Sequence, residues 1–352
     1  MTLPFVSVVV ITKNNAKTIE KCINNLLDQE YPQEFYEIIF VDGHSSDGTD
    51  EIIKGYLKVY PIMKLYYEDY GTIGYARNVG IENSKGDIIA YIDGDAYPPR
   101  EWLGKIVNAF NSNGKLAIVG GLDILTSGSK VITSSASVVD SWRRLEKKVG
   151  IKAIPCIKTV NFAIKRSVAL ASGGFDQTLS YWEEPELMAR IYVRIGMHGI
   201  LYDPHIHVYH ERVPSSGIYR RIRKVFRTSV IGVPVFLRKH MLKVAAANPV
   251  SNVATSVYMI LACILTIPSL VILIVNGLIL SALIILSLAY LAMISFYTLY
   301  ASMRTKKFAV TLPFILSLDC VARFAGAFFG LMKMLVKYLK QNYAKTFTIF
   351  AR

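Results

Sequence analysis

The chain has 352 residues, 52% of them hydrophobic, and a formal net charge of +14. The charge is uneven, because residues 1–211 carry 22 basic and 25 acidic side chains, while residues 212–352 carry 18 basic side chains and a single acidic one. A basic half this apolar is typical of contact with an anionic membrane surface and argues against a nucleic-acid partner. The four cysteines are scattered without CxxC spacing, which excludes structural zinc.

The first third of the chain alternates strand-like and helix-like segments. Strand-like runs rich in Val, Ile and Tyr cover residues 6–12, 36–43, 63–69 and 87–95. The segments between them repeat apolar residues at helical spacing, over residues 16–30, 47–60 and 74–86. This alternation, with strands that are apolar throughout, predicts an α/β domain with a mostly parallel sheet covered by helices on both faces.

Polar residues follow three of these predicted strands at the point where each strand ends. Thr12 and Asn14 follow the first strand, Asp42 ends the second, and Asp93 and Asp95 end the last. Ligands collect at the carboxyl ends of parallel strands, so these side chains are expected to lie together. The Asp93–Asp95 pair is either an Asp-Gly turn or a divalent metal site, in which a cation offsets the repulsion between two carboxylates. The convergence of polar strand ends favours the metal site.

The middle of the chain is less regular, but five segments have clear patterns. We expect strands over residues 117–125 and 199–211, a helix over 135–150, a strand that runs into a helix over 158–176, and a helix over 181–196. These elements extend the globular domain to residue 211.

Residues 212–250 mix basic and apolar side chains. Ile222 and Phe226 can form one face of a helix, with Arg223 and Arg227 among the basic residues around the rest. Such a helix is either an ordinary solvated helix or one that lies on a membrane surface. The apolar segments that follow favour the membrane surface, so we expect basic interfacial linker helices here.

Residues 251–303 are expected to form two transmembrane helices. Only Asn276-Gly277 interrupts an uncharged apolar stretch about twice as long as the ~20 residues that cross a bilayer. The tip between the spans has no Lys or Arg, whereas a basic cluster at residues 304–307 follows the second span. The positive-inside rule therefore predicts a multi-pass protein of the cell membrane with its globular domain in the cytoplasm.

Residues 304–352 hold a third apolar segment and a basic tail. The segment is long enough to span, but it contains Asp319 and Arg323 four residues apart, and spanning would put the lysines of the tail outside. A helix that lies in the membrane plane, in which Asp319 and Arg323 pair, is therefore favoured over a spanning one.

Three sequence blocks resemble family 2 glycosyltransferases, in the order and at the spacing of that family. They are residues 8–51, which open with VVVITKNN and close with FVDGHSSDGTDE, residues 74–99 (GYARNVGIENSKGDIIAYIDGDAYPP), and residues 172–196 (SGGFDQTLSYWEEPELMARIYVRIG). The resemblance covers about the first 210 residues. It implies a catalytic domain over residues 1–211 with the GT-A fold, a Rossmann-like α/β domain, here followed by an all-α membrane region.

The resemblance also implies a pocket for a nucleotide-sugar donor, a UDP- or GDP-sugar. Asp42 would accept hydrogen bonds from the base of the nucleotide, and Thr12 and Asn14 would line the same pocket. Arg77 in the GYARN block would approach the nucleotide. The chain has Gly43-His44 where many members of the family have Asp-Gly, which is a departure from the pattern at this pocket.

Asp93 and Asp95 match the DxD pair of the family. They would bind Mg²⁺ or Mn²⁺, with Asp95 as the direct ligand, and the cation would neutralise the diphosphate of the donor. His210 resembles a late histidine of the family that approaches the metal or the diphosphate; a structural hydrogen bond is the alternative for a histidine at a strand end.

The segment WEEPEL matches the block in which the family places its general base. Glu184 would be the base, with Glu183 beside it, and adjacent carboxylates can raise one pKa enough to suit proton transfer from a hydroxyl. The alternative is an acidic first turn of a helix, in which Glu183, Glu184 and Glu186 are favoured by the helix dipole. Glu stands here where the family more often has Asp.

Three further residues are weaker candidates for contacts with the donor. Asn161 lies in a block that the family uses near the donor sugar or the acceptor, and Arg223 and Arg227 could hold a diphosphate or a lipid phosphate. The resemblance and the predicted anchor together indicate an inverting sugar transfer to a lipid-linked acceptor. The WEEPEL block favours a glycan hydroxyl over a polyprenyl phosphate, which needs no base, and a non-catalytic nucleotide-sugar-binding membrane module is the further alternative.

Overall fold

The computed structural model describes residues 3–127, 130–134, 157–211, 218–247, 322–323 and 325–338. The chain divides into two compact units, Met1–Asp140 with Ile154–Pro214, and Ser141–Ala153 with Ser215–Arg352. The expected helix over residues 135–150 and the two expected transmembrane helices over residues 251–303 lie outside the described residues. Within the described ranges, no helix combines the length and the apolar composition that a bilayer crossing requires.

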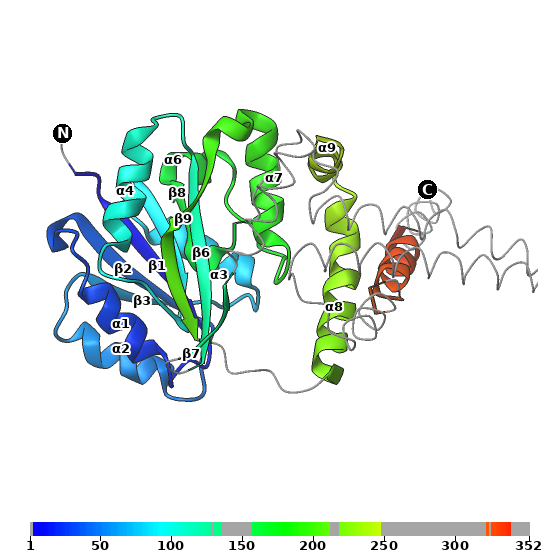
Figure 1. Cartoon of the computed structure of the whole chain (residues 1–352). Coiled ribbons are helices and arrows are strands. Elements are labelled where there is room, and N and C mark those ends of the chain that lie inside the picture. Colours follow the sequence, from blue (N-terminus) through cyan, green and yellow to red (C-terminus); the bar gives the residue numbers. More distant parts are fainter. Residues whose placement is uncertain are drawn as a thin grey trace, which may run out of the picture. The chain divides into compact units, whose positions relative to one another are not determined.

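The predicted strand–helix alternation of the first third is confirmed. Four parallel strands lie in the order β3-β2-β1-β4, and along the chain one helix lies between each strand and the next. Figure 1 labels β1, β2 and β3 and the three helices α1, α2 and α3. The elements are β1 (Val6–Thr12), α1 (Ile19–Leu27), β2 (Tyr36–Asp42), α2 (Thr49–Leu57), β3 (Met63–Tyr67), α3 (Ile73–Asn83) and β4 (Ile88–Asp93).

The second half of the sheet is mixed, so the expectation of a mostly parallel sheet was wrong there. β8 is antiparallel to β4 and to β6, β9 is parallel to β6, and β5 is antiparallel to β9, with β7 on β6. An apolar strand pattern indicates that the strand is buried, but not whether it runs parallel or antiparallel to its neighbours. The connections between the strands decide that direction. These strands are β5 (Ala96–Tyr97), β6 (Ile118–Ser127), β7 (Lys130–Ser134), β8 (Phe162–Lys165) and β9 (Ile200–Glu211), and the short helix η2 (Thr159–Asn161) precedes β8.

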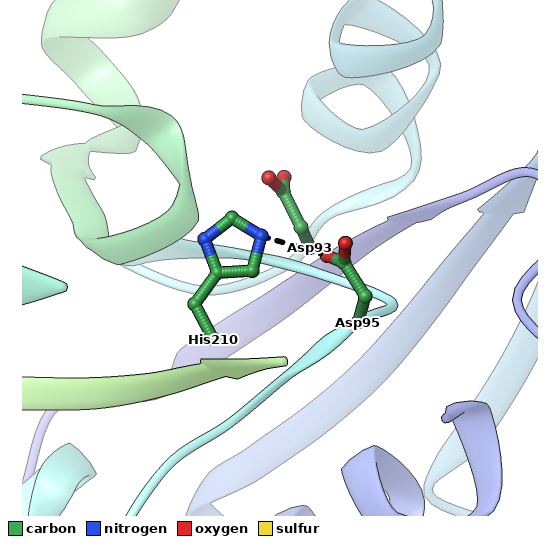
Figure 2. A group of neighbouring side chains, drawn as sticks. All are labelled: Asp93, Asp95 and His210. Carbon is green, nitrogen blue, oxygen red and sulfur yellow. Dashed lines mark ion pairs between the residues drawn. The ribbon is translucent and has the colours of Figure 1, made fainter. Parts of the chain in front are cut away.

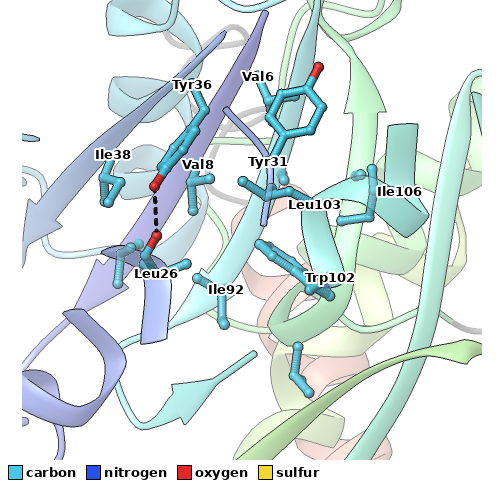
Figure 3. Close-up of a cluster of buried hydrophobic side chains, with 14 of the residues drawn as sticks. Val6, Val8, Leu26, Tyr31, Tyr36, Ile38, Ile92, Trp102, Leu103 and Ile106 are labelled. Carbon is cyan, nitrogen blue, oxygen red and sulfur yellow. Dashed lines mark hydrogen bonds between the residues drawn. The ribbon is translucent and has the colours of Figure 1, made fainter. Parts of the chain in front are cut away.

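Apolar side chains fill both faces of the sheet. One cluster joins the sheet to α1, α2 and α4 (Trp102–Ser112), and Figure 3 shows part of it, including the Tyr36 hydroxyl that donates to the Leu26 carbonyl at 3.1 Å. The other cluster joins the sheet to α3, α6 (Arg166–Ala171) and α7 (Glu183–Ile195). Val8 belongs to the first cluster and Val9 to the second, because successive side chains of a strand point to opposite faces.

The described residues of the second unit are helical. They comprise α8 (Ile218–Phe236), α9 (Lys239–Ala247) and most of residues 322–338. Residues 325–338 pack against α8: the rings of Phe226 and Phe329 meet edge to face, 5.7 Å apart. A Cβ on Gly326 would lie 2.6 Å from the Phe226 carbonyl oxygen, so the two backbones approach closely here. A helix within the predicted linker is confirmed, while its contact with a membrane stays a prediction.

β6 and β9 approach each other closely at Gly121. A Cβ at this position would lie 1.7 Å from the carbonyl oxygen of Ile206 and 2.8 Å from the side-chain nitrogen of Asn161. The register between the two strands shifts at Gly121/Leu122, and the next stretch of β9 leads to His210. The absence of a side chain at Gly121 therefore lets β9 run beside β6 to its end.

Gly121→Ala is expected to destabilise the protein by about 1–3 kcal/mol or more, because a backbone oxygen cannot yield as a flexible side chain would. Gly104→Ala is the matched control: it lies inside α4, an added Cβ meets nothing within 4 Å, and the change should stabilise by about 0.5–1 kcal/mol. Thermal unfolding of both variants checks the expected opposite signs. A Gly121→Ala protein as stable as wild type would contradict the described approach of the strands.

Candidate active site

The polar ends of three strands lie side by side, as the sequence predicted. In the sheet, Thr12 at the end of β1 is opposite Asp42 at the end of β2, and Ile11 is opposite Asp93 at the end of β4. Thr12 and Asp42 are buried, and Asp93 is partly exposed. The carboxyl edge of the sheet therefore carries a continuous row of polar side chains.

The loops that follow β1 and β2 hold each other by hydrogen bonds. Asn14 has a left-handed backbone (φ 56°), its amide donates to Ser45 Oγ at 2.8 Å, and its Oδ1 accepts from the Ser46 amide at 2.9 Å. Ser45 in turn donates to Asp42 from its amide at 2.7 Å and from its hydroxyl at 2.6 Å. Thr12 donates to Asn15 Oδ1 at 2.9 Å. These hydrogen bonds fix the two loops relative to each other at the carboxyl edge of the sheet. The contacts of Thr12, Asn14 and Asp42 with a nucleotide stay predictions.

Asp93, Asp95 and His210 form a group of side chains that point toward one another (Figure 2). One ligand atom from each lies within 4.8 Å of the others, and His210 Nε2 is 3.2 Å from Asp95 Oδ1. The short pairing of β5 with β9 brings them together: Ala96 is opposite His210, and the Glu211 amide donates to the Asp95 carbonyl at 2.8 Å.

The chemistry of this group fits a divalent cation. Burial and the charge of Asp95 raise the pKa of Asp93 to about 6, although the cation of Arg77 acts in the opposite direction. The Nδ1 atom of His210 is buried and has no hydrogen-bond partner within the described ranges. Two carboxylates and an imidazole are a donor set that Mn²⁺ or Mg²⁺ can use, and a cation there would remove the repulsion that raises the pKa of Asp93.

The first turn of α7 carries Glu183 and Glu184 in different environments. Glu183 is 3% exposed, and its Oε1 accepts a hydrogen bond from the buried guanidinium of Arg77. Burial and the neighbouring charge of Glu184 nevertheless raise the pKa of Glu183 to about 7, against the opposing effect of Arg77. The side chain of Glu184 is 23% exposed. Of the two carboxylates, Glu184 is therefore the more accessible one.

Thr159 connects these groups, and no motif in the sequence pointed to it. Its hydroxyl donates to Glu184 Oε1 at 2.8 Å and accepts from the guanidinium of Arg77. Arg77 was expected to approach the nucleotide; here its two terminal nitrogens contact Glu183, Thr159 and, at 3.8 Å, Glu184. The charge of Arg77 also acts on Asp93, so one buried cation influences both the DxD pair and the first turn of α7. No spacing rule links a threonine before β8 to a helix 24 residues later.

Asn161 has a structural environment. It is 1% exposed, its Oδ1 accepts from the indole of Trp102 at 2.9 Å, and its Nδ2 donates to the carbonyls of Leu122 and Ile206, both at 3.0 Å. These hydrogen bonds tie η2, directly before β8, to α4, β6 and β9. The predicted contact of Asn161 with the donor sugar stays a prediction.

Arg223 and Arg227 are exposed on α8 in the second unit, and their contact with a phosphate stays a prediction. His44, where the chain departs from the pattern of the family, has a left-handed backbone (φ 56°), stacks on Tyr67 and lies 2.7 Å from Asp69.

Comparison with known proteins agrees with this geometry. Residues 7–170 match the family model described as Glycosyl transferase family 2. The match covers slightly less than half of the chain, and most of it lies within the first unit. Two of the three sequence blocks, residues 8–51 and 74–99, lie within this match, and the match supports their resemblance to the family. The third block, residues 172–196, lies beyond it.

Curated relatives match this domain over part of their length. Glycosyltransferase AglE of Haloferax volcanii is 35% identical over 179 residues, which are 51% of this chain and 58% of that protein. A Methanococcus voltae protein named dolichyl N-acetyl-alpha-D-glucosaminyl phosphate 3-beta-D-2,3-diacetamido-2,3-dideoxy-beta-D-glucuronosyltransferase is 36% identical over 124 residues, which are 34% of this chain and 39% of that protein. The matched stretch thus spans 58% and 39% of the length of these two relatives.

Solved structures share the fold. The mannosyltransferase PcManGT from Pyrobaculum calidifontis, in complex with GDP-Man and Mn²⁺, has a TM-score of 0.58 at 20% identity, over 92% of this chain and 88% of that chain. GalNAc-T7, with UDP, GalNAc and Mn²⁺, has a TM-score of 0.52 at 18% identity, over 70% of this chain and 54% of that chain. The first unit therefore has a GT-A-like fold with a mixed sheet.

Mn²⁺ is expected to raise the melting temperature of the wild-type protein at pH 8 and to leave that of Asp95→Asn unchanged. The effect should shrink near pH 5, because a proton on Asp93, whose pKa is about 6, competes with the metal. Without metal, stability from the protonated Asp93 should be lost as the pH rises through about 6, since the folded-state pKa lies above the unfolded one. Differential scanning fluorimetry measures these shifts, with Asp28→Asn as the exposed control, and an equal Mn²⁺ effect in Asp95→Asn would argue against the site.

Proposed function

We propose that this protein is a metal-dependent, inverting family 2 glycosyltransferase that moves a sugar from a UDP- or GDP-sugar to a hydroxyl of a lipid-linked glycan. The observation that carries the proposal is the joint presence, within one GT-A-like unit, of the Asp93–Asp95–His210 group and an accessible carboxylate at Glu184. The charge of Glu184 acts on Asp93, so the two features are electrostatic neighbours. A cation site beside a base is what displacement of a nucleoside diphosphate by a hydroxyl needs.

Each residue has a distinct part in this proposal. Asp95, Asp93 and His210 would hold Mg²⁺ or Mn²⁺, which when bound neutralises the diphosphate and makes it a better leaving group. Glu184 takes the proton of the acceptor hydroxyl as the oxygen bonds to the anomeric carbon, and the bond from that carbon to the diphosphate breaks. Attack from the side opposite the leaving group inverts the anomeric configuration.

The donor and acceptor classes follow from the relatives and from the site. The Methanococcus voltae relative is named for transfer to a sugar on a dolichyl phosphate, and PcManGT was solved with GDP-Man and Mn²⁺. A hydroxyl acceptor has to lose a proton, whereas a polyprenyl phosphate is already an anion. The partly exposed Glu184, held by Thr159, therefore supports the hydroxyl acceptor.

We also propose that the protein is a multi-pass protein of the cell membrane with its glycosyltransferase domain in the cytoplasm. The support is the uncharged apolar stretch over residues 251–303 and the basic clusters on both of its flanks. A membrane position would bring the domain to its lipid-linked acceptor.

Glu184→Gln is expected to lower turnover by about 100-fold or more, because an amide cannot take the proton of the acceptor. Asp95→Asn is expected to reduce turnover to background, since the diphosphate would lose its cation. The measurement is release of nucleoside diphosphate by detergent-purified protein with a panel of UDP- and GDP-sugars, Mg²⁺ or Mn²⁺, and a lipid extract. Glu82→Gln, an exposed carboxylate on α3, is the matched control.

Two outcomes would contradict this proposal, one on the acceptor and one on the enzymatic activity. If Asp95→Asn is inactive while Glu184→Gln keeps full turnover, the acceptor is a polyprenyl phosphate. If the wild-type protein binds nucleotide-sugar but releases no diphosphate with any donor, the chain is a binding module and not an enzyme.

The membrane assignment is tested separately. The full chain expressed in bacteria should stay in the membrane pellet after extraction with alkaline carbonate, because about 40 or more apolar residues in two spans resist removal without detergent. Release of the intact chain into the supernatant would contradict the two spans.

A further inference from the structure

Two neighbours, Arg77 and Glu184, determine which hydrogen bonds the hydroxyl of Thr159 makes. Thr159 is 2% exposed, and the guanidinium of Arg77 donates to its oxygen. The hydroxyl hydrogen therefore has Glu184 as its acceptor, at 2.8 Å from Thr159 Oγ1 to Glu184 Oε1. The amide of Thr159 also points at this same oxygen, at 3.4 Å. Thr159 thus fixes one carboxylate oxygen of Glu184 from two directions.

The two oxygens of Glu184 are consequently different. Every hydrogen bond and ion pair of this carboxylate within the described ranges goes to Oε1, from Thr159 and from Arg77. Oε2 receives none of them, and the side chain is partly exposed. A base needs one oxygen with a free lone pair and a fixed direction, and Oε2 has both.

The backbone before Glu184 is held in an unfavourable conformation. Trp182, directly before α7, has φ 70° in the left-handed region, which is strained for a bulky side chain. The next residue, Glu183, is anchored by the buried Arg77. Because Arg77 also contacts Thr159, one guanidinium fixes both the start of α7 and the group that orients Glu184.

We propose that Thr159 is a positioning residue for the base Glu184: it holds Oε1 so that Oε2 takes the proton of the acceptor hydroxyl. As this proton moves to Oε2, the acceptor oxygen bonds to the anomeric carbon and the electron pair of the old bond leaves with the diphosphate. Arg77 acts further back by orienting Thr159 and by anchoring Glu183, which therefore serves as the partner of a cation and not as the base. This inference rests on the proposed function.

The test compares Thr159→Val, which keeps the shape but loses the hydroxyl, with Thr159→Ser, which keeps the hydroxyl. In the detergent assay, kcat of Thr159→Val should fall by about 10- to 100-fold, part of the general-base contribution, while its KM for the donor stays within about threefold of wild type. Thr159→Ser should keep kcat within about threefold of wild type, because its hydroxyl can make the same bond. If Thr159 had a purely structural role, its substitution would not lower kcat while leaving KM unchanged. The Thr159→Val and Thr159→Ser variants would then also be impaired to a similar degree.

Each other outcome counts against the inference. Equal kcat in Thr159→Val and wild type, or an equal loss in Thr159→Ser and Thr159→Val, would overturn it. If Thr159→Val shows no cooperative unfolding, the Thr159→Ala and Thr159→Ser pair replaces it: only an impaired alanine variant beside an active serine variant supports the role of the hydroxyl.

Failure of the proposed function is distinguishable from failure of the inference. An inactive wild-type protein refutes the enzyme. An active wild-type protein with a fully active Glu184→Gln variant refutes the base, and Thr159 as its positioning residue with it. An active wild-type protein, an inactive Glu184→Gln variant and a fully active Thr159→Val variant refute the inference alone.

Discussion

The short antiparallel pairing of β5 with the end of β9 is the constraint on which the candidate active site depends. It places Ala96 opposite His210, and the bond from the Glu211 amide to the Asp95 carbonyl holds the turn that carries both aspartates. Without this pairing, a side chain more than 110 residues along the chain would have no fixed distance to Asp95. Gly121 also helps to place His210 near the aspartates, because it lets β9 approach β6 before β9 reaches His210.

The Asp93–Asp95 and Glu183–Glu184 pairs share one nearby positive charge, that of Arg77. The buried cation of Arg77 lies near Asp93, Glu183 and Glu184, and one positive charge cannot balance all of them. The pKa values of Asp93 and Glu183 are therefore raised, with burial as the main cause. An edge with this excess of negative charge suits a divalent cation, and Glu184 is the more accessible carboxylate of the Glu183–Glu184 pair beside it.

The sequence was most informative where local pattern and burial coincide. The β-branched strands of the first third and the polar residues at their ends were predicted because a parallel sheet buries its strands and exposes their carboxyl ends together. The direction of β8 was not predicted, since its apolar residues pack equally well in either direction. Asn161 shows a related limit: its amide could face a ligand or the core, and only the positions of Trp102, Leu122 and Ile206 decide between them.

The sequence by itself determined the class of the domain, the family blocks and the aspartates of the candidate metal group, because these depend on residue type at short spacing. The tertiary structure decided which carboxylate of the Glu183–Glu184 pair is buried and which is accessible. It also decided that Thr159 and Arg77 hold them. The two contacts of Arg77 join residues 82 and 106 positions apart, and the Thr159–Glu184 contact joins residues 25 positions apart. Such pairs form only when the sheet and its helices have packed.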